Sequence, residues 1–87
     1  MSFRRLRGVK LPEEEQGFIR YSCLTYSRQP KKVQEKIHRL CDICGGEYSS
    51  ALFEVMCSRT SMTQISMKYS ISESVLYKRR QKFYESW

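Results

Sequence analysis

Prolines and glycines divide this chain into short segments, and that division limits its fold more than any other feature. Pro12 and Pro30 each suit the first turn of a helix, because the backbone N–H that proline lacks would be unpaired there. Gly45 and Gly46 follow a helical pattern and can end it in the left-handed conformation that glycine adopts easily. We therefore expect an all-α fold, a compact bundle of four to five short helices with a C-terminal helix-turn-helix.

Each segment carries its own helical signal. Residues 13–26 begin with three glutamates, which suit a helix start, although the β-prone run FIRYSCLTY within them also permits an extended segment. Between residues 33 and 44 apolar side chains recur every three or four positions, which is typical of one buried helix face. Residues 48–58 form a third apolar-rich helix. The last two helices make up the helix-turn-helix, at about residues 61–84.

These helices form one small domain. A chain of 87 residues buries only about 60–65% of its unfolded surface, so its core is modest. We assign residues 12–87 to a single helical domain and residues 1–11 to a flexible basic N-terminal arm. The cations of the arm are Arg4, Arg5, Arg7 and Lys10.

The charge of the chain favours a negatively charged partner. Sixteen lysines and arginines against nine acidic residues give a net charge of +7. This balance suits DNA, RNA, an acidic protein or an anionic membrane surface, while solubility alone is the plainer explanation. No run approaches the ~20 apolar residues that span a bilayer, and the N-terminus lacks the apolar core of a secretory signal. We therefore expect a cytoplasmic protein with no membrane partner.

The stretch SMTQISMKYSISESVLYKRRQK, residues 61–82, fits a helix-turn-helix. Ile65 and Ser66 supply the apolar and small pair that the first helix needs where the second crosses it. Leu76 anchors the second helix inward, and a serine before it can cap its start. Ser70 stands where glycine often adopts a left-handed conformation, so we expect a turn of a slightly different type. An ordinary helical hairpin with solvated cations is the alternative.

The second of these helices carries most of the side chains expected to bind DNA. Polar residues on its outer face would meet base edges, and cations would meet phosphates, which position a protein without reading sequence. The expected base-reading residues are Ser72, Glu73, Ser74, Tyr77, Lys78 and Gln81. The expected phosphate contacts are Arg28, Lys31, Lys32, Arg79, Arg80 and Lys82.

Residues 30–87 resemble a known family, most closely over the motif ISES-LY-RR-FYE-W. The run ALFEVMCSRTSMTQISMKYSISESVLYKRRQKFYESW is similar to the C-terminal part of sigma-factor region 4-like helix-turn-helix proteins, small regulators of bacterial phages and conjugative elements. The resemblance implies a compact all-helical domain whose second motif helix, here Ser72 to Phe83, enters the DNA major groove. It also implies that the residues nearest the bases are Glu73, Ser74, Tyr77 and Lys78.

In true sigma factors this domain reads the upstream promoter element and rests on RNA polymerase. No second domain that could melt a promoter accompanies it in this sequence, so the resemblance implies an activator, a repressor or an accessory factor. The expected partners are double-stranded DNA and, beside it, RNA polymerase or a second copy of the chain, because one reading helix alone binds weakly.

The four cysteines allow two interpretations. Cys41-x2-Cys44 followed by two glycines has the spacing of a zinc knuckle, and Cys23 and Cys57 could complete a four-thiolate site. However, Cys41 and Cys44 share the apolar face of their helix and a second close pair is missing, so packing in the core is favoured. His38 is expected at the surface or its boundary. We therefore assign no metal and no cofactor.

Other classes of function have less support. His38 has no third group to orient it beside Cys41, and short helices leave little room for a pocket that excludes water, so we expect no enzyme and no catalytic residue. RNA binding lacks tyrosines arranged as stacking platforms on a sheet. The main alternative to DNA binding is an interaction adaptor for RNA polymerase or a partner regulator. It would use the aromatic C-terminus, which contains Phe83, Tyr84 and Trp87.

Overall fold

The computed structural model describes residues 9–87, and that range contains five α-helices. They are α1 (Glu13–Leu24), α2 (Lys31–Gly45), α3 (Ser49–Cys57), α4 (Met62–Tyr69) and α5 (Glu73–Ser86). Two 3-10 turns, η1 (Tyr26–Arg28) and η2 (Gly46–Tyr48), connect α1 to α2 and α2 to α3. No strand occurs within residues 9–87, and the expected all-α bundle is confirmed.

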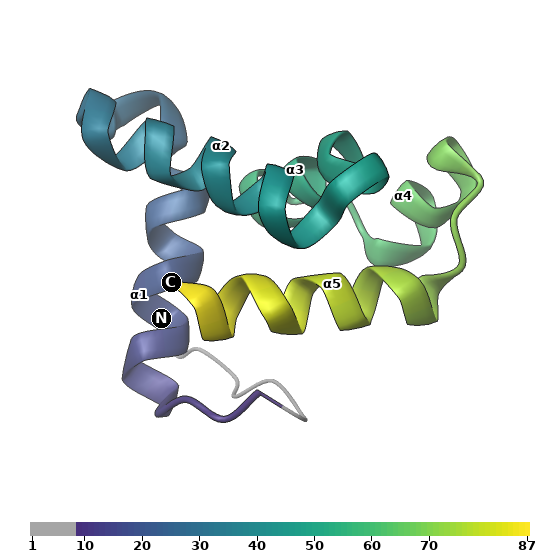
Figure 1. Cartoon of the computed structure of the whole chain (residues 1–87), viewed down its shortest axis with the longest axis horizontal. Helices are drawn as coiled ribbons and strands as arrows, with labels where there is room; N and C mark the ends of the chain where they lie inside the picture. The colour runs from purple at the N-terminus through teal and green to yellow at the C-terminus, as the bar shows by residue number, and fades with distance from the viewer. Residues whose placement is uncertain (1–8) are drawn as a thin grey trace.

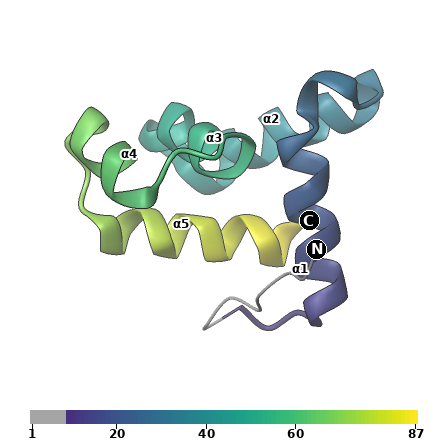
Figure 2. The same ribbon diagram turned by 180° about the vertical axis from the view of Figure 1, so that it is seen from behind.

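Helix α5 contacts α2, α3 and α4. Figure 1 shows α5 lying lengthwise beside α2 and α3, with α1 crossing near its C-terminal end. Figure 2, the view from behind, shows the same order and places α4 at the opposite end of α5, joined to it by a tight turn. The other four helices therefore support α5 along its length.

The helices begin and end where local chemistry requires it. Pro12 and Pro30 directly precede α1 and α2, as expected for residues that lose no needed hydrogen-bond donor there. Gly46 follows α2 with a φ of 57°, a value that suits a residue without a Cβ. Residues 13–24 are helical, so the extended alternative for this segment is not adopted.

Each helix contributes apolar side chains to one core. Leu76 and Phe83 of α5 are fully buried, which confirms Leu76 as the inward anchor of its helix, whereas Val75 is half-buried. The core also includes side chains from the other four helices. Among them are Ile19, Ile37, Leu52, Met56 and Ile65.

The cysteines belong mainly to this core. Cys23, Cys41 and Cys44 are buried and Cys57 is half-buried, all as free thiols, so the expected packing of Cys41 and Cys44 is confirmed. Burial raises the pKa of Cys41 to about 12. A hydrogen bond with Cys57, together with burial, raises the pKa of Cys23 as well. Among residues 9–87 no three potential metal ligands lie close enough together to hold an ion.

The last residues of the expected N-terminal arm contact the helical domain. Val9 is buried, and the backbone N–H of Lys10 donates to the Glu85 carboxylate at 3.4 Å. The Leu11 carbonyl accepts a hydrogen bond from the Gln16 side chain at 2.8 Å. The other cations of that arm lie outside the described residues, and they are Arg4, Arg5 and Arg7.

Candidate nucleic-acid interface

A tight turn sets the angle between α4 and α5. Ser70 adopts the left-handed backbone conformation there, with φ 54° and ψ 44°. The backbone N–H groups of Ser70 and Ile71 both donate to the Ser66 carbonyl, and the Ser66 hydroxyl donates to the Ile71 carbonyl. Ser70 thus takes the conformation that glycine usually supplies, and the slightly different turn predicted from its presence is not what forms.

Serine caps and a side-chain contact fix the starts of both helices. The Ser61 hydroxyl accepts a backbone N–H of α4, and the Ser72 hydroxyl accepts a backbone N–H of α5. The Thr63 hydroxyl donates to the Glu73 carboxylate at 3.4 Å, which links the two starts. Ser72 and Glu73, both expected to read bases, are therefore exposed but already bonded to groups of the protein.

Beyond its first turn, α5 has a polar outer face. Ser74, Lys78 and Gln81 recur at spacings of four and three, which places them on one side of the helix, opposite its buried side. Ser74 and Lys78 are exposed, whereas Gln81 is half-buried and its amide lies 3.4 Å from the Glu85 carboxylate. Tyr77 lies at the edge of this face and is 45% exposed. The structure brings these four predicted base-reading residues together at the surface.

Two of the expected phosphate contacts support the fold. The Arg79 guanidinium donates to the Cys44 carbonyl at 3.4 Å, at the end of α2, and lies 5.8 Å from the centre of the Tyr48 ring. Arg80 is half-buried and lies 4.8 Å from the centre of the Tyr77 ring, and burial lowers its pKa. Of the three phosphate contacts predicted on α5, Lys82 is the exposed one.

The three other expected phosphate contacts do not form one group. Lys32 lines a depression of about 340 Å³ between the first half of α2 and the end of α5. Neither Arg28, which is exposed in η1, nor Lys31 lines that depression. The Lys31 ammonium lies 4.0 Å from the Glu35 carboxylate instead, one helical turn further along α2.

Two further cations of α2 are not among the phosphate contacts predicted from the sequence. Lys36 and Arg39 line the same depression as Lys32. They follow Lys32 at spacings of four and seven, so helical periodicity could have placed the three on one side of α2. Nothing in the sequence shows that this side borders α5, because that contact joins segments far apart in the chain.

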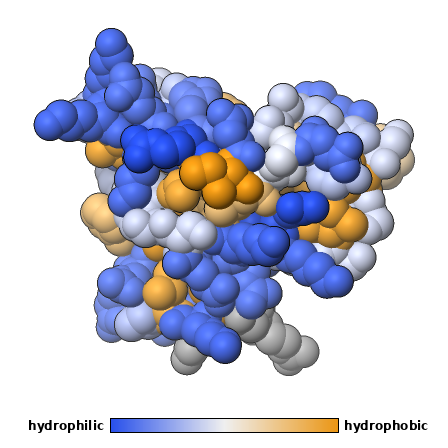
Figure 3. Space-filling view, viewed as in Figure 1, coloured by the Kyte–Doolittle hydropathy of each residue, from blue (hydrophilic) through white to orange (hydrophobic). Residues whose placement is uncertain are grey.

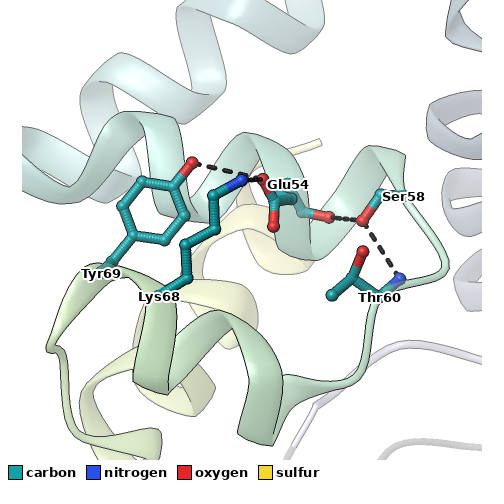
Figure 4. A network of polar contacts seen from close by, with 5 residues as sticks. All are labelled: Glu54, Ser58, Thr60, Lys68 and Tyr69. Carbon is teal, nitrogen blue, oxygen red and sulfur yellow. Dashed lines mark hydrogen bonds and ion pairs between the residues drawn. The ribbon is translucent and has the colours of Figure 1, made fainter.

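A hydrogen-bond network between α3 and α4 holds α4 against the bundle (Figure 4). The Glu54 carboxylate accepts from the Lys68 ammonium at 2.8 Å and from the Tyr69 hydroxyl at 3.3 Å. This bonding raises the pKa of Lys68. The Ser58 hydroxyl donates to the Glu54 carbonyl and accepts the backbone N–H of Thr60, which orders the connection before α4. The last turn of α4, next to the left-handed turn, is therefore fixed to α3.

The aromatic C-terminus packs mainly into the fold. Phe83 and Tyr84 are buried, and Trp87 is half-buried with its ring centre 6.5 Å from that of Phe18. Among the described aromatic residues the two most exposed lie on α1 instead, where Phe18 is 62% and Tyr21 is 61% exposed.

His38 lies at the surface of α2, as expected. Its ring stacks on Phe53 with a centroid separation of 5.0 Å, and its Nε2 is hydrogen-bonded to the Tyr26 hydroxyl. His38 and Phe53 also line a depression of about 470 Å³ that Cys41 and Cys57 border.

No helix within residues 9–87 combines the length and the apolar character needed to cross a bilayer. Comparisons with family models, with curated proteins and with solved structures found no match for this chain.

Proposed function

We propose that the protein is a transcription regulator that binds duplex DNA through α5, the second helix of a helix-turn-helix formed by α4 and α5. The observation that carries this proposal is the two-sided character of α5. Its outer face gathers polar side chains at the surface, while Leu76 and Phe83 hold the opposite side in the core. A helix anchored on one side only can enter a groove without any loss of packing.

The size and chemistry of α5 suit the major groove. Its 14 residues span about 21 Å at a rise of 1.5 Å per residue, and a major groove about 12 Å wide admits a helix. Lysine binds the O6 and N7 atoms of guanine, and glutamine binds the N6 and N7 atoms of adenine. Lys78 and Gln81 therefore have the donors and acceptors that base reading needs, and Lys82 would bind a phosphate.

The resemblance to sigma-factor region 4-like regulators supports the same proposal. It assigns the reading helix to residues 72–83, and α5 covers residues 73–86. The resemblance implies an activator, a repressor or an accessory factor, so the sign of regulation is a separate question from DNA binding.

Selection of bound duplexes from a random pool at near-physiological salt tests the proposal, and an enriched motif is the expected result. Two single variants then separate the roles of neighbouring exposed lysines. Lys78→Gln is expected to change the preferred base at one position of the motif. Lys82→Gln is expected to weaken binding to every duplex by the same factor and to lower the slope of log K against log salt by about 0.9.

A pool without enrichment, together with an affinity for duplex DNA that does not change with salt, would contradict DNA binding through α5. Because Lys78 and Lys82 are both exposed, neither substitution is expected to unfold the protein, and circular dichroism of each variant checks this.

An interaction adaptor for RNA polymerase or a partner regulator is the second candidate. The exposed rings of Phe18 and Tyr21 favour it, because aromatic anchors dominate interface energetics. The aromatic C-terminus favours it less, since Phe83 and Tyr84 are buried. Gel filtration with purified bacterial RNA polymerase tests this role. Binding that is lost in F18S/Y21S supports it, and binding that is absent or unchanged excludes this surface.

A further inference from the structure

Two rows of cations border the contact between α2 and α5. The row on α2 lines the depression beside the end of α5 and consists of Lys32, Lys36 and Arg39. The row on α5 lines a second depression, which Lys78 of the outer face also borders, and consists of Arg79 and Lys82. We name these five residues the α2–α5 strip.

In each row, one cation contacts the opposite helix or the residue that follows it. Arg79 reaches from α5 to the Cys44 carbonyl at the C-terminal end of α2. Near the other end, the Lys36 ammonium of α2 lies 4.3 Å from the centre of the Trp87 ring, just after α5. Figure 3 shows the face that carries α2 and α5 as mainly hydrophilic, with an apolar area near its middle and others toward its sides. The strip therefore follows the contact between the two helices.

The fold supplies the strip with no acidic partner. Glu35 is the carboxylate that lines the depression on α2, and it pairs with Lys31, which lies outside the strip. Within residues 9–87 no salt bridge includes a member of the strip. Like charges three and four positions apart on a helix repel one another. The strip thus opposes folding slightly, and a bound polyanion would remove that repulsion.

We infer that the α2–α5 strip binds the phosphate backbone of one DNA strand, beside the major groove that α5 enters. This inference rests on the proposed function of α5. When the outer face of α5 points into the groove, one of the two bordering backbones passes on the side of α5 that faces α2. Cations three or four positions apart on a helix have Cβ atoms about 5–6 Å apart, so neighbouring side chains can meet neighbouring phosphates.

The strip differs from the set of phosphate contacts expected from the sequence. It adds Lys36 and Arg39, which were not expected to bind DNA, and it retains Lys32, Arg79 and Lys82. It leaves out Arg28 and Lys31, which line neither depression, and Arg80, which is half-buried elsewhere on α5.

Two double variants of equal charge test this assignment. K32Q/R39Q removes two exposed cations of the strip, and R28Q/K31Q removes two exposed cations outside it. Both lower the net charge from +7 to +5, so general attraction to DNA changes equally. The affinity of each protein for a short duplex is measured by fluorescence anisotropy over a series of salt concentrations, and circular dichroism confirms that each variant is folded.

The two variants are expected to differ. K32Q/R39Q should reduce the slope of log K against log salt by about 1.8, and the affinity by roughly ten- to a hundredfold at 0.1 M salt. R28Q/K31Q should keep a slope close to that of the unsubstituted protein. Equal slopes for both variants would overturn the strip while leaving DNA binding through α5 intact. Failure of the unsubstituted protein to bind duplex DNA at any salt would overturn the proposed function and the strip together.

Discussion

At the residue scale, Ser70 has the most demanding backbone conformation. It is the one residue other than glycine with a positive φ among residues 9–87. A left-handed conformation costs a residue with a Cβ about 1–2 kcal/mol, because the Cβ approaches the following carbonyl oxygen. The hydrogen bonds at Ser66 offset this cost, so the turn before α5 is held by local bonds and not by an intrinsic preference of its central residue.

Replacing Ser70 with glycine is therefore expected to stabilise the protein by about 0.5–1 kcal/mol, and Ser70→Val to destabilise it by about 1–2 kcal/mol. Urea unfolding followed by circular dichroism measures both. Ser74→Gly is the matched control, because the same change within an exposed helix should destabilise by about 0.3–0.5 kcal/mol. A lower free energy of unfolding for Ser70→Gly would show that the left-handed conformation of Ser70 does not reduce the stability of the protein.

Tyr84 gives the protein a specific sensitivity to alkaline pH. Burial raises the pKa of its hydroxyl from 10.0 to about 12, even though nearby Arg20 and Arg80 act in the opposite direction. Between pH 10 and pH 12 the unfolded chain loses this proton while the folded protein keeps it. The free energy of unfolding therefore falls as pH rises through that window, and below it the contribution is fully present.

Between pH 10 and pH 12 the free energy of unfolding of Tyr84→Phe is expected to fall less than that of the unsubstituted protein, by up to about 2 kcal/mol. The measurement is the free energy of unfolding as a function of pH, compared between the two proteins, because the difference in slope isolates Tyr84 from other groups that titrate there. Parallel curves between pH 10 and pH 12 would show that burial does not protect the hydroxyl.

At the element scale, arginines join helices by bonding to backbone carbonyls at helix ends. Arg20 of α1 donates to the carbonyls of Val55, Met56 and Ser58 at the end of α3. The last carbonyls of a helix lack partners within it, and a cation suits the negative end of the helix dipole. Arg79 makes the corresponding contact at the end of α2. Arg20 therefore joins the end of α3 to α1, and Arg79 joins the end of α2 to α5.

Arg20→Gln is expected to destabilise the protein by about 2 kcal/mol, because several carbonyls lose a charged donor at once. Arg39→Gln is the matched control, since Arg39 is exposed on α2, and it should change stability by no more than about 0.5 kcal/mol. Both are measured by urea unfolding. Similar effects of the two substitutions would mean that Arg20 contributes through its charge alone.

Most helix ends could be predicted from the sequence, because they depend on local chemistry. Pro12 and Pro30 set two starts, and serine caps set the starts of α4 and α5. The outer face of α5 could also be predicted, from spacing alone. The internal use of Arg20 and Arg79 could not, because each bonds to carbonyls 35 or more positions away in the chain. The number of cations in the sequence does not show which of them stabilise the fold and which are available to bind a partner.

At the scale of the whole molecule, the end of α5 completes the bundle. Phe83 and Tyr84 are buried where α1 and α2 meet α5, and Trp87 covers Phe83 with ring centres 6.1 Å apart. Glu85 also accepts a hydrogen bond from Lys10, and Trp87 contacts Phe18, so the end of the chain meets segments from its first half. The fold is complete only when both ends of the described chain are in place.

Removal of residues 83–87 is consequently expected to unfold the protein, since truncation of a buried Phe alone costs about 3–5 kcal/mol and small domains have little more to lose. Circular dichroism and gel filtration of the truncated chain test this. Trp87→Ala, at a half-buried position, is the milder control and should remain folded. A truncated chain that stays helical but changes its oligomeric state would instead identify the C-terminus as an interface.

The two-sided character of α5 has a consequence for how such a protein diversifies. Leu76, Phe83 and Tyr84 carry the structural demands on this helix, so the opposite positions are under little constraint from folding. A library randomised at Ser74, Lys78 and Gln81 should yield mostly folded members. New binding preferences can then arise through a few surface substitutions, with no compensating mutations in the interior.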